Sequence, residues 1–171
     1  MKQRKNLFVL VVALSFILGC CGASHALEWG KSELETEKLA VNFHNEVVKG
    51  GYKIVTVEQL KAILDKGGAI LVVDTMPFAD SFQKQHIPGA VNMEFPMEEM
   101  AQIAPEKAAA LEKLLGPDKN KPVVFYCGFT KCARSHNAAM WAIKLGYKDV
   151  SRCPGGIKGW MDASYPTEKA K

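Results

Sequence analysis

Two cysteines, Cys127 and Cys132, lie five positions apart in a segment whose context favours thiol chemistry. The segment follows residues 122–126, a continuous apolar run that is typical of a strand buried on both faces. It precedes residues 135–145, which are predicted to be helical. Free N–H groups in a tight loop and at the start of a helix stabilise negative charge. We therefore expect the pKa of the Cys127 thiol to be lowered and its reactivity to be raised.

The neighbours of Cys127 in this loop are candidates for binding an anionic substrate. Their backbone N–H groups can converge on one point, and the cationic side chains in the loop attract anions. Gly128 lets the backbone turn tightly because it has no Cβ. Asp74, at the end of another apolar run, is interpreted first as structural, either pairing with Arg134 or supporting the loop. The candidate site comprises Cys127 as nucleophile, Gly128, Phe129, Thr130, Lys131, Cys132 and Arg134 as substrate-binding residues, and Asp74 and Cys132 as supporting residues.

Other residues of reactive type are interpreted as structural. Cys153, beside Pro154, is expected to be a small core residue. His86 is expected to hold a turn, and His136 is expected to face solvent. The cysteines and histidines lack the paired spacing of a zinc site, so no metal is expected.

Strands and helices alternate along the chain, which predicts an α/β fold with a parallel sheet covered by helices on both faces. Thr56 and Gln59 have the spacing of a capping box at the start of the first helix of the domain. Strands are predicted over residues 54–55, 69–74, 89–92, 122–126 and 150–153. Helices are predicted over residues 56–66, 105–115, 135–145 and 155–161, with one helical turn over 81–85.

Composition divides the chain into four segments. Residues 1–26 are interpreted as a signal sequence, and residues 27–51 as a helical N-terminal extension whose amphipathic helix spans 32–49. Residues 52–165 form the predicted domain, and residues 166–171 are predicted to be a disordered tail. No repeat or low-complexity linker requires a second domain.

The N-terminal segment has the order of an export signal. Three basic residues within positions 2–5 precede the apolar run 7–18, which is too short to span a bilayer well. Two processing outcomes stay open. In the first, Ser24 and Ala26 are the small residues that general signal peptidase recognises before its cleavage site. In the second, residues 17–20 resemble a bacterial lipobox, with Cys20 as the lipidation candidate. We expect a protein of the bacterial periplasm or one lipid-anchored to the cell envelope, with membrane contact only through the signal or the lipid.

The charge balance gives no case for nucleic-acid binding. The chain has 22 Lys and Arg residues against 18 Asp and Glu residues. Removing the three cations of the predicted signal leaves 19 basic residues against 18 acidic residues, so the mature domain is nearly neutral. Apolar residues make up 48% of the chain, which is enough to form a hydrophobic core.

Residues 55–160 together resemble a rhodanese domain. Each motif is weak alone, but their combination is specific. The resemblance implies a five-stranded parallel sheet between helices, a persulfide carried by Cys127, and no cofactor. The matching motifs are Leu71-Val72-Val73-Asp74, His86-Ile87-Pro88-Gly89-Ala90-Val91-Asn92, Tyr126-Cys127, Arg134-Ser135, Ala138-Ala139, Leu145-Gly146-Tyr147, Gly155-Gly156-Ile157 and Trp160.

The loop departs from the common rhodanese pattern. In that pattern an Arg stands where this chain has Cys132, and here Arg134 follows Cys127 by seven positions. The loop therefore carries a two-residue insertion, which changes the size of the anion pocket. The Cys-Gly-x-x-x-Cys pattern resembles an exported subgroup of rhodanese-like proteins. Thr75-Met76 also stands where the family often has an Arg after the strand.

Sulfur transfer is the leading hypothesis for the function. An enzyme of this type would move a sulfane sulfur from thiosulfate or polysulfide through a Cys127 persulfide to a thiol, cyanide or protein acceptor. A second hypothesis is thiol–disulfide chemistry between Cys127 and Cys132. A third is a module that binds sulfur or selenium oxyanions without turnover. Phosphatase or arsenate chemistry is disfavoured by the loop spacing, and the physiological donor, the acceptor and the oligomeric state stay open.

Overall fold

The structure is a computed structural model, and it describes residues 33–170 of the chain. The chain divides into two units, residues 1–34 and 35–171, and the sheet and the candidate site belong to the second unit. The predicted signal sequence, the lipidation candidate Cys20 and the start of the N-terminal extension lie outside the described residues. None of the helices within residues 33–170 has the length and apolar character needed to cross a membrane.

Five parallel strands form one sheet, in the order β1-β5-β4-β2-β3. All four residues of the central strand β4 are buried, because the sheet is covered on both sides of it. This arrangement confirms the predicted α/β fold with a five-stranded parallel sheet. The strands are β1 (Lys53–Ile54), β2 (Leu71–Asp74), β3 (Val91–Asn92), β4 (Val123–Tyr126) and β5 (Val150–Cys153).

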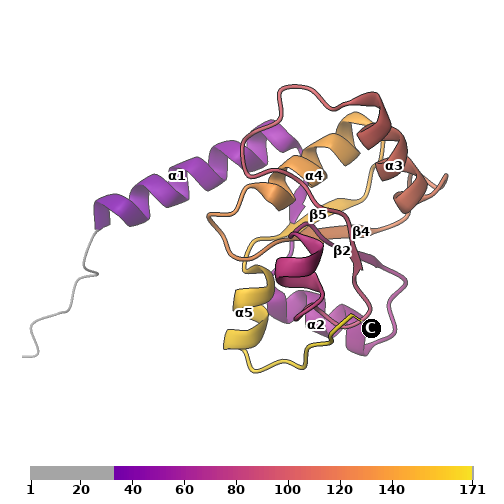
Figure 1. Cartoon of the computed structure of the whole chain (residues 1–171). Coiled ribbons are helices and arrows are strands. Elements are labelled where there is room, and N and C mark those ends of the chain that lie inside the picture. Colours follow the sequence, from indigo (N-terminus) through magenta and orange to yellow (C-terminus); the bar gives the residue numbers. More distant parts are fainter. Residues whose placement is uncertain (1–32, 171) are drawn as a thin grey trace, which may run out of the picture. The chain divides into compact units, whose positions relative to one another are not determined.

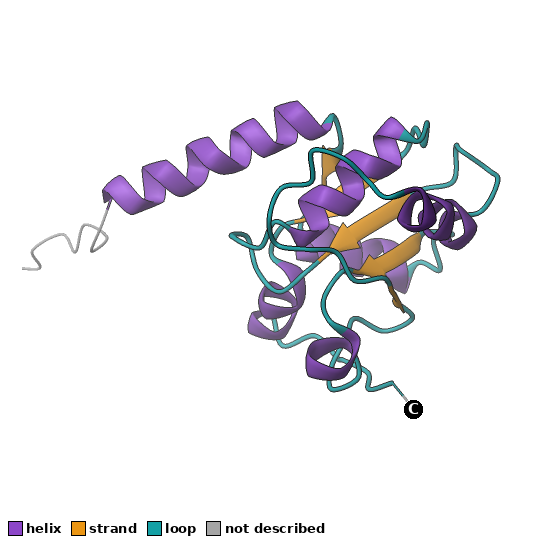
Figure 2. Ribbon diagram, turned by 45° about the horizontal axis from the view of Figure 1, so that its top comes forward, coloured by secondary structure: helices purple, strands orange, loops and turns teal. Residues whose placement is uncertain are grey.

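Helices cover both faces of the sheet, as predicted (Figures 1 and 2). On one face, α3 and α4 pack over the sheet together with the end of α1; on the other lie α2, α5 and the turn η1. The capping box predicted for α2 is present, with Thr56 and Gln59 bonded to each other's backbone N–H groups. The helical elements are α1 (Glu33–Gly50), α2 (Val57–Asp65), η1 (Phe78–Phe82), α3 (Pro105–Leu115), α4 (Arg134–Lys144) and α5 (Gly156–Asp162).

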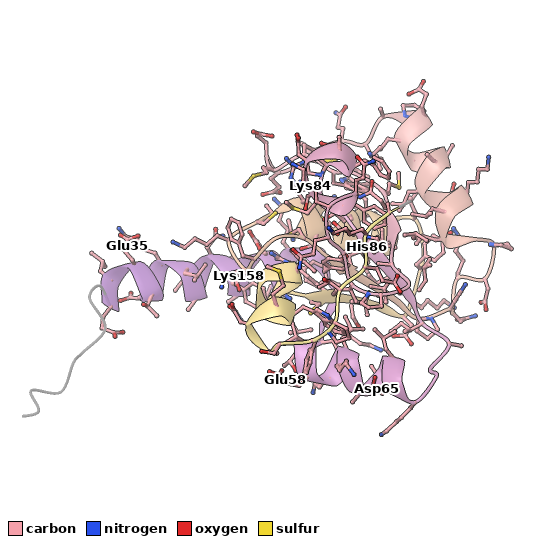
Figure 3. The ribbon with its side chains drawn as sticks, turned by 60° about the horizontal axis from the view of Figure 1, so that its bottom comes forward. Glu35, Glu58, Asp65, Lys84, His86 and Lys158 are labelled. Carbon is pink, nitrogen blue, oxygen red and sulfur yellow. The ribbon has the colours of Figure 1, made fainter. Side chains whose placement is uncertain are left out.

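The C-terminal segment is ordered over residues 166–170, so the prediction of a disordered tail is wrong there. Glu168 pairs with His86, which is labelled in Figure 3, in an antiparallel bridge with both backbone bonds at 2.9 Å. The Pro166 carbonyl accepts a 2.7 Å bond from the buried indole N–H of Trp160. The helical turn predicted over 81–85 is present as a continuation of η1, since the Gln85 N–H donates to the Ser81 carbonyl at 3.0 Å.

We predict that truncation after Tyr165 lowers the free energy of unfolding by about 1–3 kcal/mol, because the Trp160 indole N–H would be left buried without its acceptor. Chemical denaturation of the full chain and the truncated chain measures the difference. Substitution of the exposed Lys169 by Ala is the control, and it should change the free energy by less than about 0.5 kcal/mol. Equal stability of the truncated and full chains would restore the interpretation as a disordered tail.

Candidate active site

The loop that carries Cys127 begins at the carboxyl edge of the sheet. Asp74, Tyr126 and Cys153, the last residues of three adjacent strands, are paired in register. Cys127 directly follows Tyr126, so it lies where ligands bind in parallel α/β sheets. The structure confirms the predicted position of Cys127 at this edge of the sheet.

The first turn of α5 supports the loop through backbone hydrogen bonds. The N–H groups of Ile157 and Lys158 donate to the carbonyls of Cys127 and Gly128, at 2.9 and 3.0 Å. Gly156 has a φ of +59°, and a Cβ at this position would lie 2.2 Å from the Cys127 carbonyl oxygen. Only glycine allows both this backbone conformation and this close approach.

The sulfur of Cys127 is buried, with only 1% of the residue exposed. It lies 3.0 Å from the Cys132 carbonyl, to which its S–H donates, and 3.2 Å from the Ser135 hydroxyl. Burial, together with the neighbouring Cys132, raises the pKa of the Cys127 thiol well above its usual value. The expectation of a lowered pKa at Cys127 is therefore wrong, because the sequence showed the loop but not the depth of the sulfur.

The negative charge of the loop is instead favoured at Cys132. The Cys127 thiol is the largest cause of a lowered pKa at Cys132, which falls to about 6. Backbone N–H groups of Arg134 and Gly128 and the charge of Arg134 act in the same direction, against desolvation. The amides that the sequence assigned to Cys127 thus stabilise the sulfur of Cys132. Each thiol contributes to the pKa shift of the other, so the two titrate as a pair.

The cationic side chains of the loop do not meet at one anion pocket. Arg134 binds the carbonyl of Phe95 and lies 3.5 Å from the carboxylate of Glu94, so its charge is partly balanced by the chain that follows β3. Lys131 is exposed and lines a cleft of about 250 Å³ together with residues of α1. Phe129, also predicted as substrate-binding, is half exposed.

Asp74 is fully buried beside the start of the loop, and no ion pair with Arg134 is formed. One carboxylate oxygen accepts a 2.8 Å bond from the Met76 N–H, and the other has no partner within the described part of the chain. Burial raises the pKa of this carboxyl group. The geometry agrees with a structural role at the end of β2, and the predicted pairing with Arg134 is wrong.

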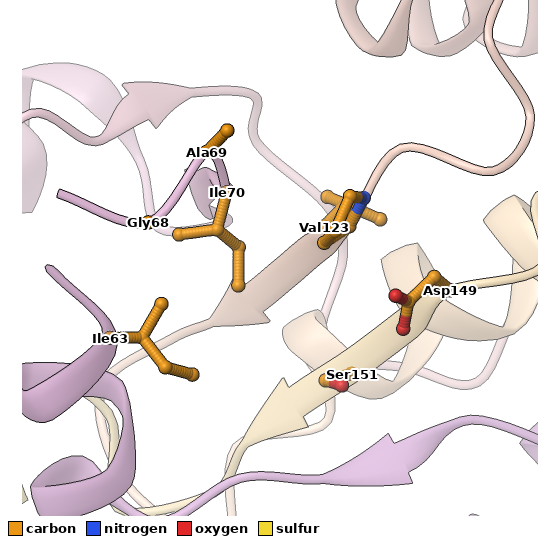
Figure 4. Close-up of a pocket in the computed structure, with 8 residues that line it drawn as sticks. Ile63, Gly68, Ala69, Ile70, Val123, Asp149 and Ser151 are labelled. Atoms are coloured by element: carbon orange, nitrogen blue, oxygen red, sulfur yellow. The ribbon is translucent and has the colours of Figure 1, made fainter. Parts of the chain in front are cut away.

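A pocket of about 310 Å³ lies at the opposite edge of the sheet, where β2 and β4 begin (Figure 4). Its lining is mostly apolar and includes Ile63, Ile70 and Val123. Because no reactive thiol lines it, this pocket is separate from the candidate site.

A family model described as "Rhodanese-like domain" matches residues 56–163, more than half of the length of the chain. The chain belongs to the rhodanese-like domain family. This confirms the resemblance seen in the sequence, whereas the exported subgroup stays a prediction. A comparison with curated proteins finds no match.

Solved structures of several proteins share the fold of this rhodanese-like domain. A thiosulfate sulfurtransferase from Pseudomonas aeruginosa is 18% identical with a TM-score of 0.55, and the match covers 78% of this chain but 23% of that one. A polysulfide-sulfur transferase homodimer from Wolinella succinogenes is 15% identical with a TM-score of 0.56, covering 84% of this chain and 96% of that one. The rhodanese-like domain of an Anabaena sp. protein is 20% identical with a TM-score of 0.53, and the match covers 68% of this chain and 79% of that one.

Sequence reasoning about this rhodanese-like domain missed Arg152, the third residue of β5. Its guanidinium group is fully buried and bonded to the carbonyls of Thr130 and Cys132 and to the Ser135 hydroxyl. The sequence did hold a signal for this role: Arg152 is a cation inside a strand that was otherwise expected to be buried, and a buried charge needs partners. Its partners are distant in the sequence, so the pattern alone does not name them.

Two other expectations about single residues have clear outcomes. Cys153 is a core residue, as predicted, and burial raises the pKa of its thiol to about 11. His136 is buried rather than exposed, with Nδ1 2.9 Å from the Tyr52 hydroxyl. Since α4 begins at Arg134, its first turn faces the sheet and Tyr52 instead of solvent.

We predict that Gly156→Ala lowers the free energy of unfolding by about 1–3 kcal/mol, because the new Cβ is incompatible with both the backbone conformation and the Cys127 carbonyl. Chemical denaturation measures this loss. Gly159→Ala is the matched control in the same helix, where a Cβ would lie 3.4 Å from a Val57 side-chain carbon. Equal effects of the two substitutions would show that α5 does not support the loop in this way.

Proposed function

We propose that this protein is a sulfurtransferase that takes a sulfane sulfur from thiosulfate or polysulfide and passes it to a thiophilic acceptor through a Cys127 persulfide. The observation that carries the proposal is the position of Cys127 at the carboxyl edge of a rhodanese-like sheet, with its S–H bonded to the Cys132 carbonyl and with opposite pKa shifts of the two thiols. Structural neighbours that act on thiosulfate and polysulfide support this class of donor. The loop is longer than the common family loop, so the substrate anion is held by a different set of side chains.

In the first step, Cys127 attacks the outer sulfur of thiosulfate. Its proton passes to the Cys132 thiolate, a new S–S bond forms at Cys127, and the bond between the two sulfurs of thiosulfate breaks. Sulfite leaves with the electron pair of that bond. The products are a Cys127 persulfide anion, a Cys132 thiol and sulfite, with the same total charge as the reactants.

Cys132 therefore acts as the proton acceptor that turns Cys127 into a nucleophile. Moving the proton from Cys127 to Cys132 places the thiolate on Cys127 without a change in the net charge of the pair. The Ser135 hydroxyl, 3.2 Å from the Cys127 sulfur, can donate to that thiolate. The second step is attack by cyanide or an acceptor thiol on the outer sulfur of the persulfide, which restores the two cysteines.

We predict that the wild-type protein forms thiocyanate from thiosulfate and cyanide and that Cys127→Ser abolishes this turnover. Cys132→Ser should lower kcat/KM by about 10²-fold and move the rise of the pH profile to higher pH, because the proton acceptor is lost. Colorimetric detection of thiocyanate over a pH series measures both effects.

Cys153→Ala is the control, because it removes a buried thiol outside the loop and should keep the wild-type pH profile. Absence of turnover by the wild type with both thiosulfate and polysulfide donors would refute the proposal. Full turnover by Cys127→Ser would also refute it.

The influence of each loop thiol on the pKa of the other favours thiol–disulfide chemistry as a second candidate function. The Cys132 thiolate would attack the inner sulfur of a protonated Cys127 persulfide, forming a Cys127–Cys132 disulfide and releasing hydrosulfide. A dithiol reductant would then be needed to restore the enzyme. Release of one hydrosulfide per enzyme, with the loss of two titratable thiols after thiosulfate treatment, would favour this route over transfer to cyanide.

A further inference from the structure

We infer that Arg152 is a positioning residue for the Cys127–Cys132 loop and that Glu46, on α1, holds Arg152 in place. The inference deepens the proposed function and rests on it for the role of the two thiols. It extends the site beyond the part of the chain that matches the family, since α1 lies before residue 56.

All five N–H donors of the Arg152 guanidinium are used. Nε donates to the Ser135 hydroxyl at 2.9 Å, and Nη2 donates to the carbonyls of Thr130 and Cys132 at 3.2 and 3.0 Å. Nη1 donates to the Glu46 carboxylate and, at 3.2 Å, to the Tyr52 hydroxyl. Three of the five acceptors belong to the loop or the first turn of α4, and two belong to α1 or the residues just after it.

The bonds on the loop side meet at Cys127. The Cys132 carbonyl that binds Arg152 is also the acceptor of the Cys127 S–H. The Ser135 oxygen that accepts from Arg152 lies 3.2 Å from the Cys127 sulfur. Because Arg152 occupies a lone pair of this oxygen, the Ser135 hydroxyl proton is free to point at the sulfur. Arg152 thus fixes two of the polar groups that contact Cys127 without contacting the sulfur itself.

The bonds on the α1 side explain why a charge is tolerated here. Arg152 is fully buried, and an unpaired cation would be strongly destabilising in that position. Glu46 supplies the opposite charge, with 17% of its side chain exposed, and the Phe43 ring lies 5.2 Å from the guanidinium carbon. Without α1, Arg152 would lose its counter-charge. We therefore assign α1 to the site as the element that keeps Arg152 directed at the loop.

The test compares Arg152→Lys and Glu46→Gln with the wild type in the full chain. Arg152→Lys keeps the charge but cannot make five bonds in fixed geometry, and Glu46→Gln keeps the shape but removes the counter-charge. The measurements are the pH profile of alkylation of the loop thiols, the kcat and KM for sulfur transfer, and the thermal unfolding midpoint. Lys53→Gln is the matched control, because it breaks an exposed ion pair with Asp149, beside β5, that does not involve the loop.

We expect Arg152→Lys to shift the alkylation pH profile and to lower kcat by about tenfold or more, with a smaller effect on the KM for thiosulfate. Glu46→Gln should shift the profile in the same direction by less, and Lys53→Gln should leave it unchanged. The other titratable groups that face this network, Tyr52, His136 and Arg134, are retained in all of these variants.

A folded Arg152→Lys protein with the wild-type alkylation profile would overturn the inference. An activity loss that follows the loss of folded protein, with no shift of the profile, would also overturn it. If Arg152→Lys does not fold, Glu46→Gln decides, since it leaves the arginine in place. Absence of sulfur transfer in the wild type refutes the proposed function only, because the alkylation profile still reports whether Arg152 positions the thiols.

Discussion

The coupling between two buried thiols in one loop is the interaction on which the chemistry of this site depends. Cys127 is too deeply buried to hold a negative charge alone, and burial raises its pKa. Cys132 is bonded to the Cys127 thiol and to loop amides, which lower its pKa to about 6. The negative charge is therefore favoured at Cys132, five positions along the loop from the sulfur that follows the strand. This separation gives the site both a nucleophile and a proton acceptor.

The fold positions Cys127 and Cys132 by holding the backbone of their loop at both ends, through contacts with α5 and with Arg152 of β5. The central strand delivers Cys127 to the carboxyl edge of the sheet, and α5 holds the first two carbonyls of the loop. Arg152 holds the far half of the loop through the carbonyls of Thr130 and Cys132. These contacts are made by the backbone of the loop, so its side chains stay free to vary with substrate. The carbonyl of Cys132 lies 3.0 Å from the Cys127 sulfur, so the loop brings its second cysteine to the first.

The sequence predicted most of the fold because the two central strands β2 and β4 lie in apolar runs with clear stops. Val123–Tyr126 has no polar residue to bury, and Thr56 with Gln59 marks the start of α2 by local bonds. The position of Cys127 followed from the same pattern. Burial depth, however, depends on packing between distant segments, so the opposite shifts in pKa of the two thiols could not be predicted. The Arg152–Glu46 pair joins residues 106 positions apart, and the bridge between His86 and Glu168 is equally non-local.

The most direct test of this account is site-resolved alkylation of the reduced wild-type protein, quantified for each cysteine by peptide mass spectrometry over a pH series. The account predicts that alkylation of Cys132 rises through a transition near pH 6, because its thiolate persists above that pKa and is protonated below it. Alkylation of Cys127 should be slower than that of Cys132 throughout this range, because Cys127 holds its proton in the main form of the pair. A transition near pH 6 at Cys127, with Cys132 reacting only at high pH, would contradict the account.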